Sequence, residues 1–447
     1  MNSLIAPHLF VNAACVLTII IAGAFQPEPS RALGSGFADK PYMGWSSWSL
    51  EATKFPGYGG MSWLTEMHVK QQSDTMHRLL QEYGYKYVNL DSGWCGGYDN
   101  YGRPIPDRSK FPDGIKGIAR YVHRNGQKLG IYWVPGIARD LYDRNPPILD
   151  SPYHLQDIAA KPLSPANAWG WNYKIDFSKP GAQEYIDSIA YLFASWGVDF
   201  LKLDGVVPGS DHDNTVDARP DVEAWAKAIR KTHRKIWLEL SWRIDSRYAD
   251  YWSKYANGWR VGDDVDSYGN TLTNWGNIRR TFDAVATWSG LSGKGIGWND
   301  LDSLDVGNGE MDGLTDIERK TAVTLWAISC SPLYTGDDLT KLDPYGIRLL
   351  TNKEVITVDQ SGIPAERVAN GEKQVWCVFR KDGSRIVALF NLSSSPSSVV
   401  ASWSEIGLMG KAKVRDLWSH KDLGVFQGEY QANLPAHGCE LLKIVDF

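Results

Sequence analysis

Short apolar runs and amphipathic stretches alternate along the chain from about residue 40 to about residue 339. The apolar runs have the length of buried strands, and the stretches between them have helical spacing. This alternation is typical of βα units around a parallel sheet, and eight units most simply close into a (β/α)8 TIM barrel, which we place at residues 38–345. The candidate strands are 43–48, 85–91, 128–134, 198–204, 235–241, 257–263, 293–300 and 331–338, and clear helical stretches are 67–84, 182–197, 221–233 and 316–329.

A doubly wound open sheet is the alternative arrangement for such a pattern. That fold usually carries a glycine-rich phosphate loop after its first strand. The residues after 43–48 contain no such loop, so the barrel is favoured.

The sequence pattern changes from alternating strands and helices to strands alone after about Thr351. Short segments rich in β-forming residues follow one another there, separated by polar turns, for example QVWCVFRK and RIVALFNLS. We expect a small antiparallel β-sandwich domain at residues 351–447.

The N-terminus has the pattern of an export signal. Residues 11–25 are apolar but short for a membrane span, and Ala22-Gly23-Ala24 is a small-x-small cleavage site. We expect a signal peptide at residues 1–24 and a secreted or periplasmic protein. A retained membrane anchor is the main alternative, because no Lys or Arg precedes the apolar run.

The net charge and the composition limit the classes of molecule that this protein is expected to bind. The net charge of −5 and the lack of a Lys/Arg run argue against nucleic acid. The 20 Trp and 21 Tyr residues fit either a large aromatic core or a surface for the apolar faces of sugars. We predict no protein partner.

The five cysteines do not form a metal motif or a disulfide scaffold. Cys15 lies in the signal segment. Cys377 and Cys439 both lie in the C-terminal domain, where they form either a bridge or two buried free thiols.

Carboxylates follow several of the candidate strands. Working residues of TIM barrels lie at the C-terminal ends of strands, so these side chains should share one pocket, the setting for paired acid and base chemistry. Helix capping is the simplest structural role for any one of them, and a divalent metal could use the cluster. No His joins them, so we expect neither metal nor cofactor. The residues are Asp91, Asp204, Asp263, Asp264, Asp300 and Asp302.

These segments resemble those of glycoside hydrolase family 27, the melibiase-type α-galactosidases. The resemblance lies in MGWSSW (43–48), YKYVNLDSGW (85–94), FLKLDG (200–205), WRVGDDVD (259–266) and WNDLDSL (298–304), which occur in the family's order. It extends over nearly all of the expected mature chain.

The resemblance implies an exo-acting retaining glycosidase that removes terminal α-linked galactose from oligo- or polysaccharides. Asp204 matches the nucleophile and Asp264 the general acid/base, whereas its neighbour Asp263 is expected to be a loop carboxylate. Lys202 lies two positions before Asp204 on the same strand face, so we expect its ammonium to lower the pKa of Asp204. The substrate-binding set that follows from the resemblance is Trp48, Asp91, Ser92, Tyr132, Lys202, Ser241, Arg260 and Trp298.

Three departures fall among the sugar-binding positions. Ser92 replaces the second Asp of the family's Asp pair, Ser241 stands at the position of a Glu, and Ser303 at that of a Met. In the family, the Asp pair binds O4 and O6 of galactose and the Glu meets O2. The sequence therefore predicts intact catalysis with altered sugar recognition. An isomaltodextranase-like or other α-glycosidase is the alternative, and a barrel that binds carbohydrate without catalysis is the remote one.

Overall fold

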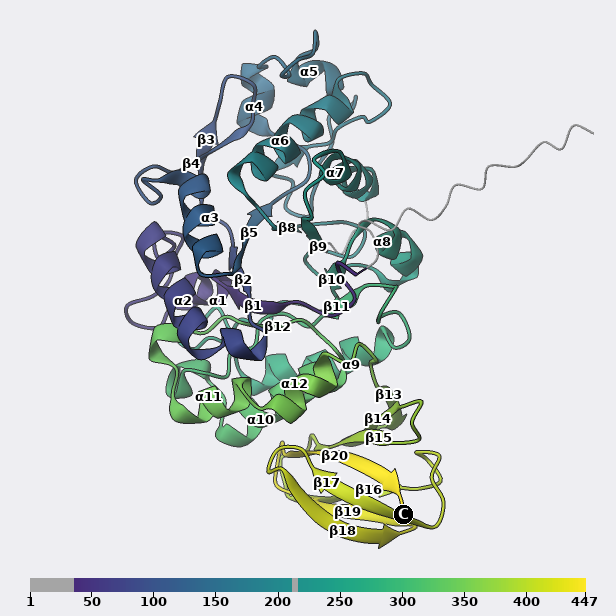
Figure 1. The fold of residues 1–447 in the computed structure, drawn as a ribbon. Helices are drawn as coiled ribbons and strands as arrows, with labels where there is room; N and C mark the ends of the chain where they lie inside the picture. The colour runs from purple at the N-terminus through teal and green to yellow at the C-terminus, as the bar shows by residue number, and fades with distance from the viewer. Residues whose placement is uncertain (1–35, 211–215) are drawn as a thin grey trace, which may run out of the picture.

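The computed structural model describes residues 36–210 and 216–447, and the larger part of it is the predicted (β/α)8 barrel (Figure 1). Eight parallel strands follow one another around the sheet in chain order, with the last strand beside the first. All eight lie within the apolar runs of the sequence. They are β1 (Met43–Ser46), β2 (Tyr87–Leu90), β5 (Lys128–Trp133), β8 (Phe200–Leu203), β9 (Trp237–Leu240), β10 (Gly258–Arg260), β11 (Trp298–Asp300) and β12 (Leu333–Thr335).

The barrel closes between β11 and β12 through an irregular junction. A parallel bridge joins Leu304 to Thr335, and the Leu304 N–H donates to the Tyr334 carbonyl at 2.8 Å. The strand ends of the seventh and eighth units are thereby held beside those of the first.

Helices cover the outside of the barrel. Helix α6 shows why they form: its buried residues, among them Tyr185, Ile189 and Phe193, recur at helical spacing, and the helix stops at Gly197, whose φ of 94° favours glycine. The principal helices are α2 (Glu66–Leu79), α3 (Gly114–Arg124), α6 (Ala182–Trp196), α7 (Arg219–Lys231), α8 (Ala249–Tyr255), α9 (Trp275–Thr287), α10 (Asp316–Ile328), α11 (Pro344–Leu350) and α12 (Lys353–Asp359).

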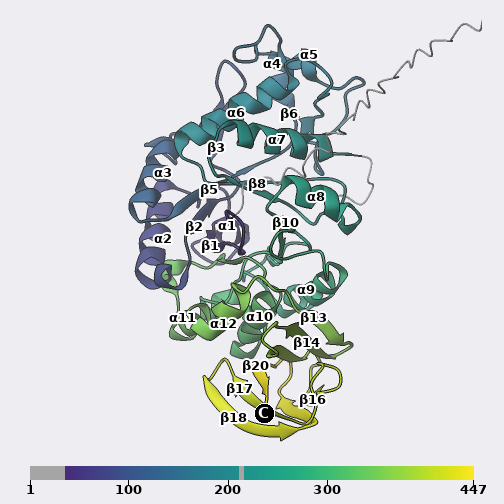
Figure 2. The same cartoon turned by 45° about the vertical axis from the view of Figure 1, so that its right-hand side comes forward.

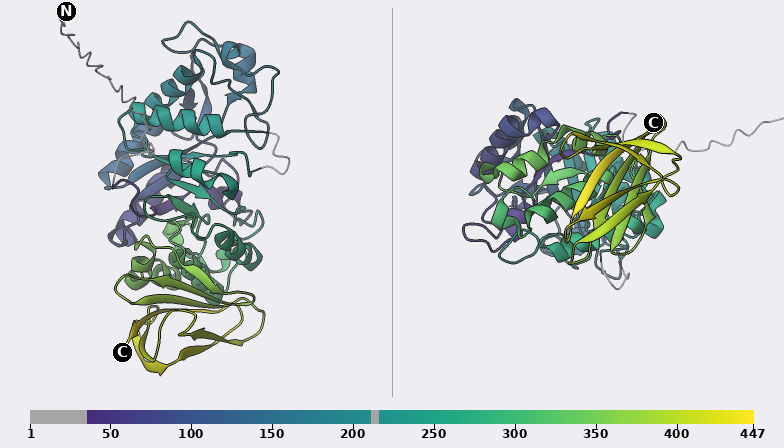
Figure 3. Two further views of the ribbon diagram at one scale, coloured as in Figure 1. Left: turned by 90° about the vertical axis from the view of Figure 1, so that its right-hand side faces the viewer. Right: turned by 90° about the horizontal axis from the view of Figure 1, so that it is seen from below.

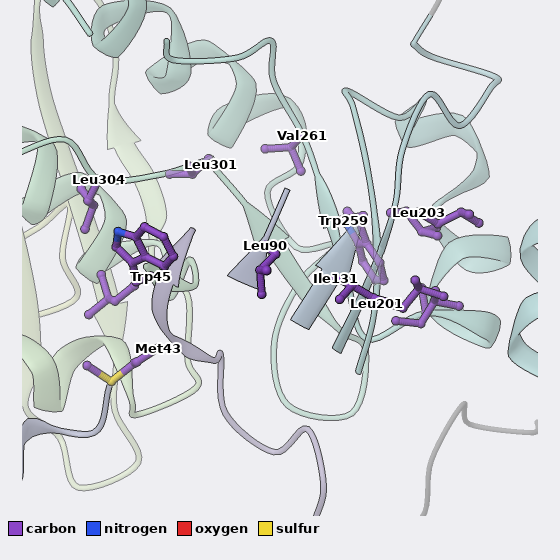
Figure 4. Packing of buried hydrophobic residues seen from close by; sticks show 14 of the residues in the cluster. Met43, Trp45, Leu90, Ile131, Leu201, Leu203, Trp259, Val261, Leu301 and Leu304 are labelled. Carbon is purple, nitrogen blue, oxygen red and sulfur yellow. The ribbon is translucent and has the colours of Figure 1, made fainter. Parts of the chain in front are cut away.

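Alternation along the strands separates two layers of side chains. Outward-facing residues such as Trp45, Leu90, Ile131, Leu201 and Trp259 are buried between sheet and helices (Figure 4). Residues one position away point into the barrel instead. The interior can therefore carry polar chemistry while the outer layer stabilises the fold.

An aromatic layer closes the N-terminal end of the barrel. Tyr87, Phe200, Trp237 and Trp298 are each the first residue of their strand, and Tyr42 lies among them with its ring 5.0 Å from that of Phe200 and 5.3 Å from that of Trp237. This layer leaves the C-terminal end of the barrel as the open end.

Trp298 belongs to this layer, which corrects its expected place in the substrate-binding set. Its indole is fully buried and donates from Nε1 to the Ala38 carbonyl at 2.9 Å. Trp298 begins β11, whereas Asp300 and Asp302 of the same motif lie at the other end of the strand.

The C-terminal domain is the predicted antiparallel sandwich, and it lies at one end of the molecule in Figures 1 and 2 and in the left view of Figure 3. A six-stranded sheet faces a two-stranded one, and Val387, Val399 and Ile444 are among the residues buried between them. The large sheet is β13 (Glu366–Ala369), β14 (Lys373–Phe379), β15 (Arg385–Asn391), β20 (Cys439–Asp446), β17 (Lys411–Asp416) and β18 (Lys421–Gln427), and the small one is β16 (Ser397–Ser402) and β19 (Glu429–Leu434).

The other face of the large sheet joins the core of the barrel domain. Phe390 packs edge-on against Phe282 of α9 with ring centroids 5.0 Å apart, and Trp418 Nε1 donates to Thr324 Oγ1 of α10 at 2.9 Å. The expected start of this domain at residue 351 differs from the structure. Helix α12 still packs against α10, and the first strand of the sandwich begins at Glu366.

The four cysteines in the described part of the chain are free thiols. Cys377 lies in the core between the two sheets, whereas Cys439 lies in the core shared with the barrel and contacts Thr324 Oγ1 at 3.2 Å. The two thiols lie on opposite faces of the large sheet, so of the two expected states of this pair the structure has the free one.

The predicted signal peptide at residues 1–24 and Cys15 lie outside the described residues. Among residues 36–210 and 216–447, no helix combines the length and the apolar character that crossing a membrane requires.

The place of Trp298 in the aromatic layer predicts that this residue contributes to the stability of the fold and not to ligand binding. Trp298→Phe removes part of a buried ring and its hydrogen bond, so we expect it to lower the free energy of unfolding by about 1–3 kcal/mol in urea titrations. Ligand affinity of the pocket at the open end should stay at the wild-type value. Loss of affinity without loss of stability would return Trp298 to the binding set.

Candidate active site

A pocket opens at the C-terminal ends of the barrel strands. Its walls combine carboxylates, one ammonium group and several aromatic rings, and a second, narrower cavity continues from its floor into the barrel, sharing Trp48, Asp91 and Lys202 with it. The pocket is lined by Trp48, Met61, Asp91, Ser92, Tyr132, Trp169, Trp171, Lys202, Asp204, Trp242, Asp264 and Tyr268.

Strand register brings one side of the site together. Tyr132 on β5 is level with Lys202 on β8, and Asp91 directly follows β2, whose residue Leu90 is paired with Ile131. Lys202 Nζ lies 2.8 Å from Asp91 Oδ2 and 5.7 Å from the centre of the Tyr132 ring. Asp204 lies two residues beyond Lys202, so both side chains point into the barrel.

Arg260 organises the opposite side. Its guanidinium is buried, and Nη2 contacts Asp264 Oδ1 at 2.9 Å and Asp302 Oδ2 at 2.8 Å. Tyr268 donates a hydrogen bond from its hydroxyl to the second oxygen of Asp264, and Trp48 Nε1 donates to that hydroxyl at 3.4 Å. Both oxygens of Asp264 are thus held in place.

Burial and neighbouring charges push the two candidate catalytic carboxylates in opposite directions. Burial raises the pKa of Asp204, and the nearby charges of Asp91 and Asp264 raise it further, against the opposing effect of Lys202. Burial also raises the pKa of Asp264, but Arg260, the Tyr268 hydroxyl and Lys202 together lower it below its usual range.

The expected effect of Lys202 is present, but it does not set the net pKa of Asp204, which is raised in the free protein. Lys202 does lower it, but its ammonium is paired with Asp91 at 2.8 Å, and burial has the larger effect on Asp204. In the resting pocket Asp264 is the more acidic of the two.

Ser241 faces Asp204 from the end of β9. The hydroxyl is fully buried and lowers the pKa of Asp204, yet within residues 36–210 and 216–447 neither Ser241 Oγ nor Asp204 Oδ1 completes a hydrogen bond. Ser241, expected in the substrate-binding set, lines neither the pocket nor the floor cavity, so its place in the structure is behind Asp204.

Ser92 lies on the pocket wall beside an apolar group. Its backbone N–H donates to Asp91 Oδ1 at 2.8 Å, and its hydroxyl points to Met61 Sδ at 4.0 Å. At this corner the pocket offers a short neutral hydroxyl and a thioether.

The structure brings most of the expected site residues to this end of the barrel. Asp263 faces away: it pairs with Arg243 at 3.3 Å, half-exposed, as expected of a loop carboxylate. Arg260 lines the floor cavity rather than the open pocket, and Trp298 lies at the far end of the barrel. Those that line the pocket are Trp48, Asp91, Ser92, Tyr132, Lys202, Asp204 and Asp264.

Sequence reasoning missed five residues of the lining: Met61, Trp169, Trp171, Trp242 and Tyr268. One signal could have found two of them. Trp169 and Trp171 end the long insertion that begins at Arg139, and long loops at this end of a barrel commonly shape its site. Tyr268 follows Asp264 by four residues, but nothing in that spacing by itself indicates a contact in a loop.

The chain matches two family models. The family model described as alpha galactosidase A matches residues 40–139 and 172–361, and that of the alpha-galactosidase C-terminal β-sandwich domain matches residues 370–444. The stretch 140–171 falls between the two matched parts of the first model.

Individual relatives agree with the models. The chain is 30% identical to an alpha-galactosidase of Oryza sativa subsp. japonica over 422 residues, which is 92% of this chain and 86% of that protein. It is 31% identical to an alpha-galactosidase of Coffea arabica over 417 residues, which is 92% of this chain and 94% of that protein.

Solved structures are also similar. A β-L-arabinopyranosidase of glycoside hydrolase family 27 from Geobacillus stearothermophilus superposes with a TM-score of 0.82 at 32% identity, over 92% of this chain and 97% of that one. Alpha-galactosidase I of Mortierella vinacea superposes with a TM-score of 0.72 at 26% identity, over 93% and 99%.

The opposite pKa shifts predict opposite effects on stability. Asp204 ionises at a cost in the folded state, so Asp204→Asn should be more stable than wild type at pH 7, by about 1.4 kcal/mol for each unit by which the folded pKa is raised. Asp264 is ionised more easily when folded, so Asp264→Asn should lose about 1–3 kcal/mol there.

Both differences should disappear in acid. The excess stability of Asp204→Asn fades as the pH falls from the raised folded pKa to the unfolded one, and the deficit of Asp264→Asn fades as the pH falls through the lowered folded pKa. Urea titrations at several pH values measure this. Stability changes of the same sign in the two variants would contradict the assigned electrostatics.

Proposed function

Because this chain belongs to the melibiase family of glycoside hydrolases, family 27, and is a glycosidase of the α-galactosidase type, we propose that it removes a terminal α-linked sugar with retention of configuration. The observation that carries the proposal is the meeting of Asp204 and Asp264 in one aromatic-lined pocket. Two carboxylates facing one glycosidic bond are what the double displacement requires. The curated relatives are enzymes, and both carboxylates are present, so a non-catalytic role is set aside.

In the first step Asp204 acts as the nucleophile. One of its oxygens bonds to the anomeric carbon while the bond from that carbon to the leaving oxygen breaks, and Asp264 gives its proton to the leaving oxygen. In the second step Asp264 takes a proton from water, the water oxygen bonds to the anomeric carbon, and the ester to Asp204 breaks. The net result is hydrolysis without change of anomeric configuration.

The reaction requires the proton to lie on Asp264, although Asp264 is the more acidic carboxyl in the free pocket. Bound substrate favours the state in which Asp264 carries the proton and Asp204 is ionised. The leaving oxygen is a hydrogen-bond acceptor and pairs best with a protonated Asp264, whereas positive charge developing at the anomeric carbon stabilises an ionised Asp204. Ionised Asp204 is therefore the costly form at rest and the stabilised form in the transition state.

The remaining polar groups serve the sugar at the reacting position. Lys202 and Asp91, joined at 2.8 Å, present charged hydrogen-bonding groups beside Asp204. Arg260 holds Asp264 at 2.9 Å and thereby positions the acid/base. Trp48 contributes a flat apolar face to the pocket wall.

Galactose is the first candidate for that sugar, in keeping with the relatives' activity. A β-L-arabinopyranoside is the second, because Ser92 replaces a carboxylate where the family's Asp pair binds O4 and O6, and the Ser92 hydroxyl lies beside the thioether of Met61. A pyranose without the exocyclic hydroxymethyl group has no O6, so it loses fewer hydrogen bonds than galactose when that carboxylate is absent. The similar structure from Geobacillus stearothermophilus is an enzyme of that specificity.

Export is part of the proposal. The apolar segment 11–25 and the Ala22-Gly23-Ala24 site support it. Mass spectrometry of the secreted protein should find an N-terminus after residue 24, and retention of the full chain in the cytoplasm would refute it.

The roles of the two carboxylates can be tested by azide rescue. Asp204→Ala should lose about 10⁴-fold or more of kcat. Asp264→Ala should lose about 10²–10⁴-fold on poor leaving groups and much less on an activated aryl glycoside, which needs little protonation. Azide should then give a β-glycosyl azide with Asp204→Ala and an α-glycosyl azide with Asp264→Ala, identified by NMR.

Asp263→Ala is the matched control, since Asp263 is the neighbouring carboxylate outside the pocket lining. It should keep nearly wild-type kcat. Exchange of the azide products between the two variants would reverse the roles, and a damaging Asp263→Ala would show that the wrong member of the pair was chosen.

The sugar can be tested with a panel of aryl glycosides: α-galactoside, α-glucoside, α-N-acetylgalactosaminide and β-L-arabinopyranoside. We expect Ser92 to leave the galactoside-to-glucoside ratio of kcat/KM far below that of relatives with the Asp pair. Ser92→Asp should raise the ratio about 10- to 100-fold, because a charged hydrogen bond of about 1.5–3 kcal/mol rewards the axial O4.

Ser92→Ala provides the control, because it removes the hydroxyl without adding charge and should change the ratio little. A wild-type preference for the α-glucoside would favour the isomaltodextranase-like alternative. A wild-type preference for galactoside over glucoside by many orders of magnitude would show that other residues bind O4.

A further inference from the structure

Three tryptophans form a continuous stack at the rim of the pocket. The rings of Trp169 and Trp171 are 4.5 Å apart between centroids with 19° between their planes, and those of Trp169 and Trp242 are 5.8 Å apart with 4° between their planes. All three line the pocket that contains Asp204 and Asp264. Trp171 is the outermost by exposure, with 54% of its surface in contact with solvent.

The stack is fixed relative to the reacting carboxylates. Trp169 lies against Gly205, the residue after Asp204: a Cβ on Gly205 would come within 2.4 Å of the Trp169 ring, and the φ of 69° there also favours glycine. The Ala168 N–H donates to the Gly205 carbonyl at 3.0 Å. Trp242 directly follows Ser241 at the end of β9.

The loop that carries Trp171 is also held from below. Asn167 is fully buried, donates from Nδ2 to the Pro135 carbonyl at 3.3 Å and accepts from the Trp171 N–H at 3.3 Å. Arg139 donates to the Gly170 carbonyl at 2.8 Å. The exposed indole therefore sits on an ordered support.

Trp169 and Trp171 come from the segment 140–171, which the family model does not match. In Figure 1 this insertion, with α4 (Arg139–Arg144) and α5 (Leu155–Ile158), lies at the opposite end of the molecule from the C-terminal domain. The barrel thus supplies the carboxylates and Trp242, and the insertion supplies the outer part of the stack.

We propose that the stack of Trp171, Trp169 and Trp242 is a binding site for the leaving group, which must present a flat apolar face, either that of a pyranose ring or an aromatic ring. The proposal rests on the function proposed above. The sugar that reacts lies against Asp204, so the group beyond the scissile bond extends toward the rim. An exposed indole on a rigid loop binds such a face by dispersion and loss of water, at little cost in ordering.

The test compares leaving groups of different size on one sugar. The substrates are α-galactosyl fluoride, whose leaving group is a single atom, a nitrophenyl α-galactoside and an α-linked galactosyl disaccharide. Trp171→Leu keeps an apolar side chain without a flat ring, and Trp171→Phe keeps a ring. Tyr191→Leu, which replaces another half-exposed aromatic residue, on α6 away from the pocket lining, is the control.

We expect Trp171→Leu to lower kcat/KM about tenfold on the disaccharide, the aryl glycoside or both, which corresponds to about 1.4 kcal/mol of transition-state binding. The fluoride should change less than twofold, and Trp171→Phe should recover most of the loss. A loss confined to the disaccharide identifies a sugar as the occupant, and one confined to the aryl glycoside an aromatic group.

Equal losses on all three substrates, or no loss on any, would overturn the proposal. If the panel of aryl glycosides favours another sugar, that sugar replaces galactose in the three substrates. A wild-type enzyme that turns over none of the panel would refute the proposed function itself, whereas failure of this inference appears in the variant ratios of an active enzyme.

Discussion

The structure depends on keeping many carboxylates inside one barrel with few cations among them. Lys202 and Arg260 are the cations of the floor cavity, which they share with Asp91, Asp300, Asp302 and Glu239. Burial raises the pKa of Asp300 to about 6 and that of Glu239 well above its usual range. Such groups are tolerated because the two cations and hydrogen bonds offset part of the cost, and because the folded protein has stability elsewhere. The pKa of Asp204 is raised because burial outweighs the effect of Lys202, whereas that of Asp264 is lowered because Arg260, the Tyr268 hydroxyl and Lys202 together outweigh burial.

That stability comes from how the strands divide their side chains. Outward residues join the large core under the helices, and the first residues of four strands join the aromatic layer that closes the barrel. The inward-facing strand positions on the C-terminal side of that layer are therefore not needed for the hydrophobic core and can carry polar side chains. The backbone of Gly258 lies close to the carboxylate of Glu239. A Cβ on Gly258 would lie 2.4 Å from Glu239 Oε2, so glycine leaves room for the buried carboxylate. The polar interior can be crowded because its walls and floor are rigid.

In the proposed reaction, catalysis and selectivity are carried by different parts of the chain. The carboxylates of the proposed reaction lie at or just beyond the ends of barrel strands, whose positions the sheet sets. The corners of the pocket that we propose for contact with the sugar and its leaving group come from Ser92, Met61 and the insertion with Trp169 and Trp171. Loops can change without disturbing the hydrogen-bonded barrel, which is why family members can share a reaction and differ in substrate.

The sequence by itself determined the barrel, the sandwich and the acidic strand ends, because alternating apolar patterns are local and parallel strands end at one rim. It placed Trp298 with the substrate, because a motif does not state at which end of its strand a ligand lies. Only the tertiary structure decided the pKa order of Asp204 and Asp264, the contact of Tyr268 with Asp264, and the stacking of Trp242 on Trp169. Each of these depends on distances between segments far apart in the chain or on loop conformation, and neither residue spacing nor composition encodes such distances.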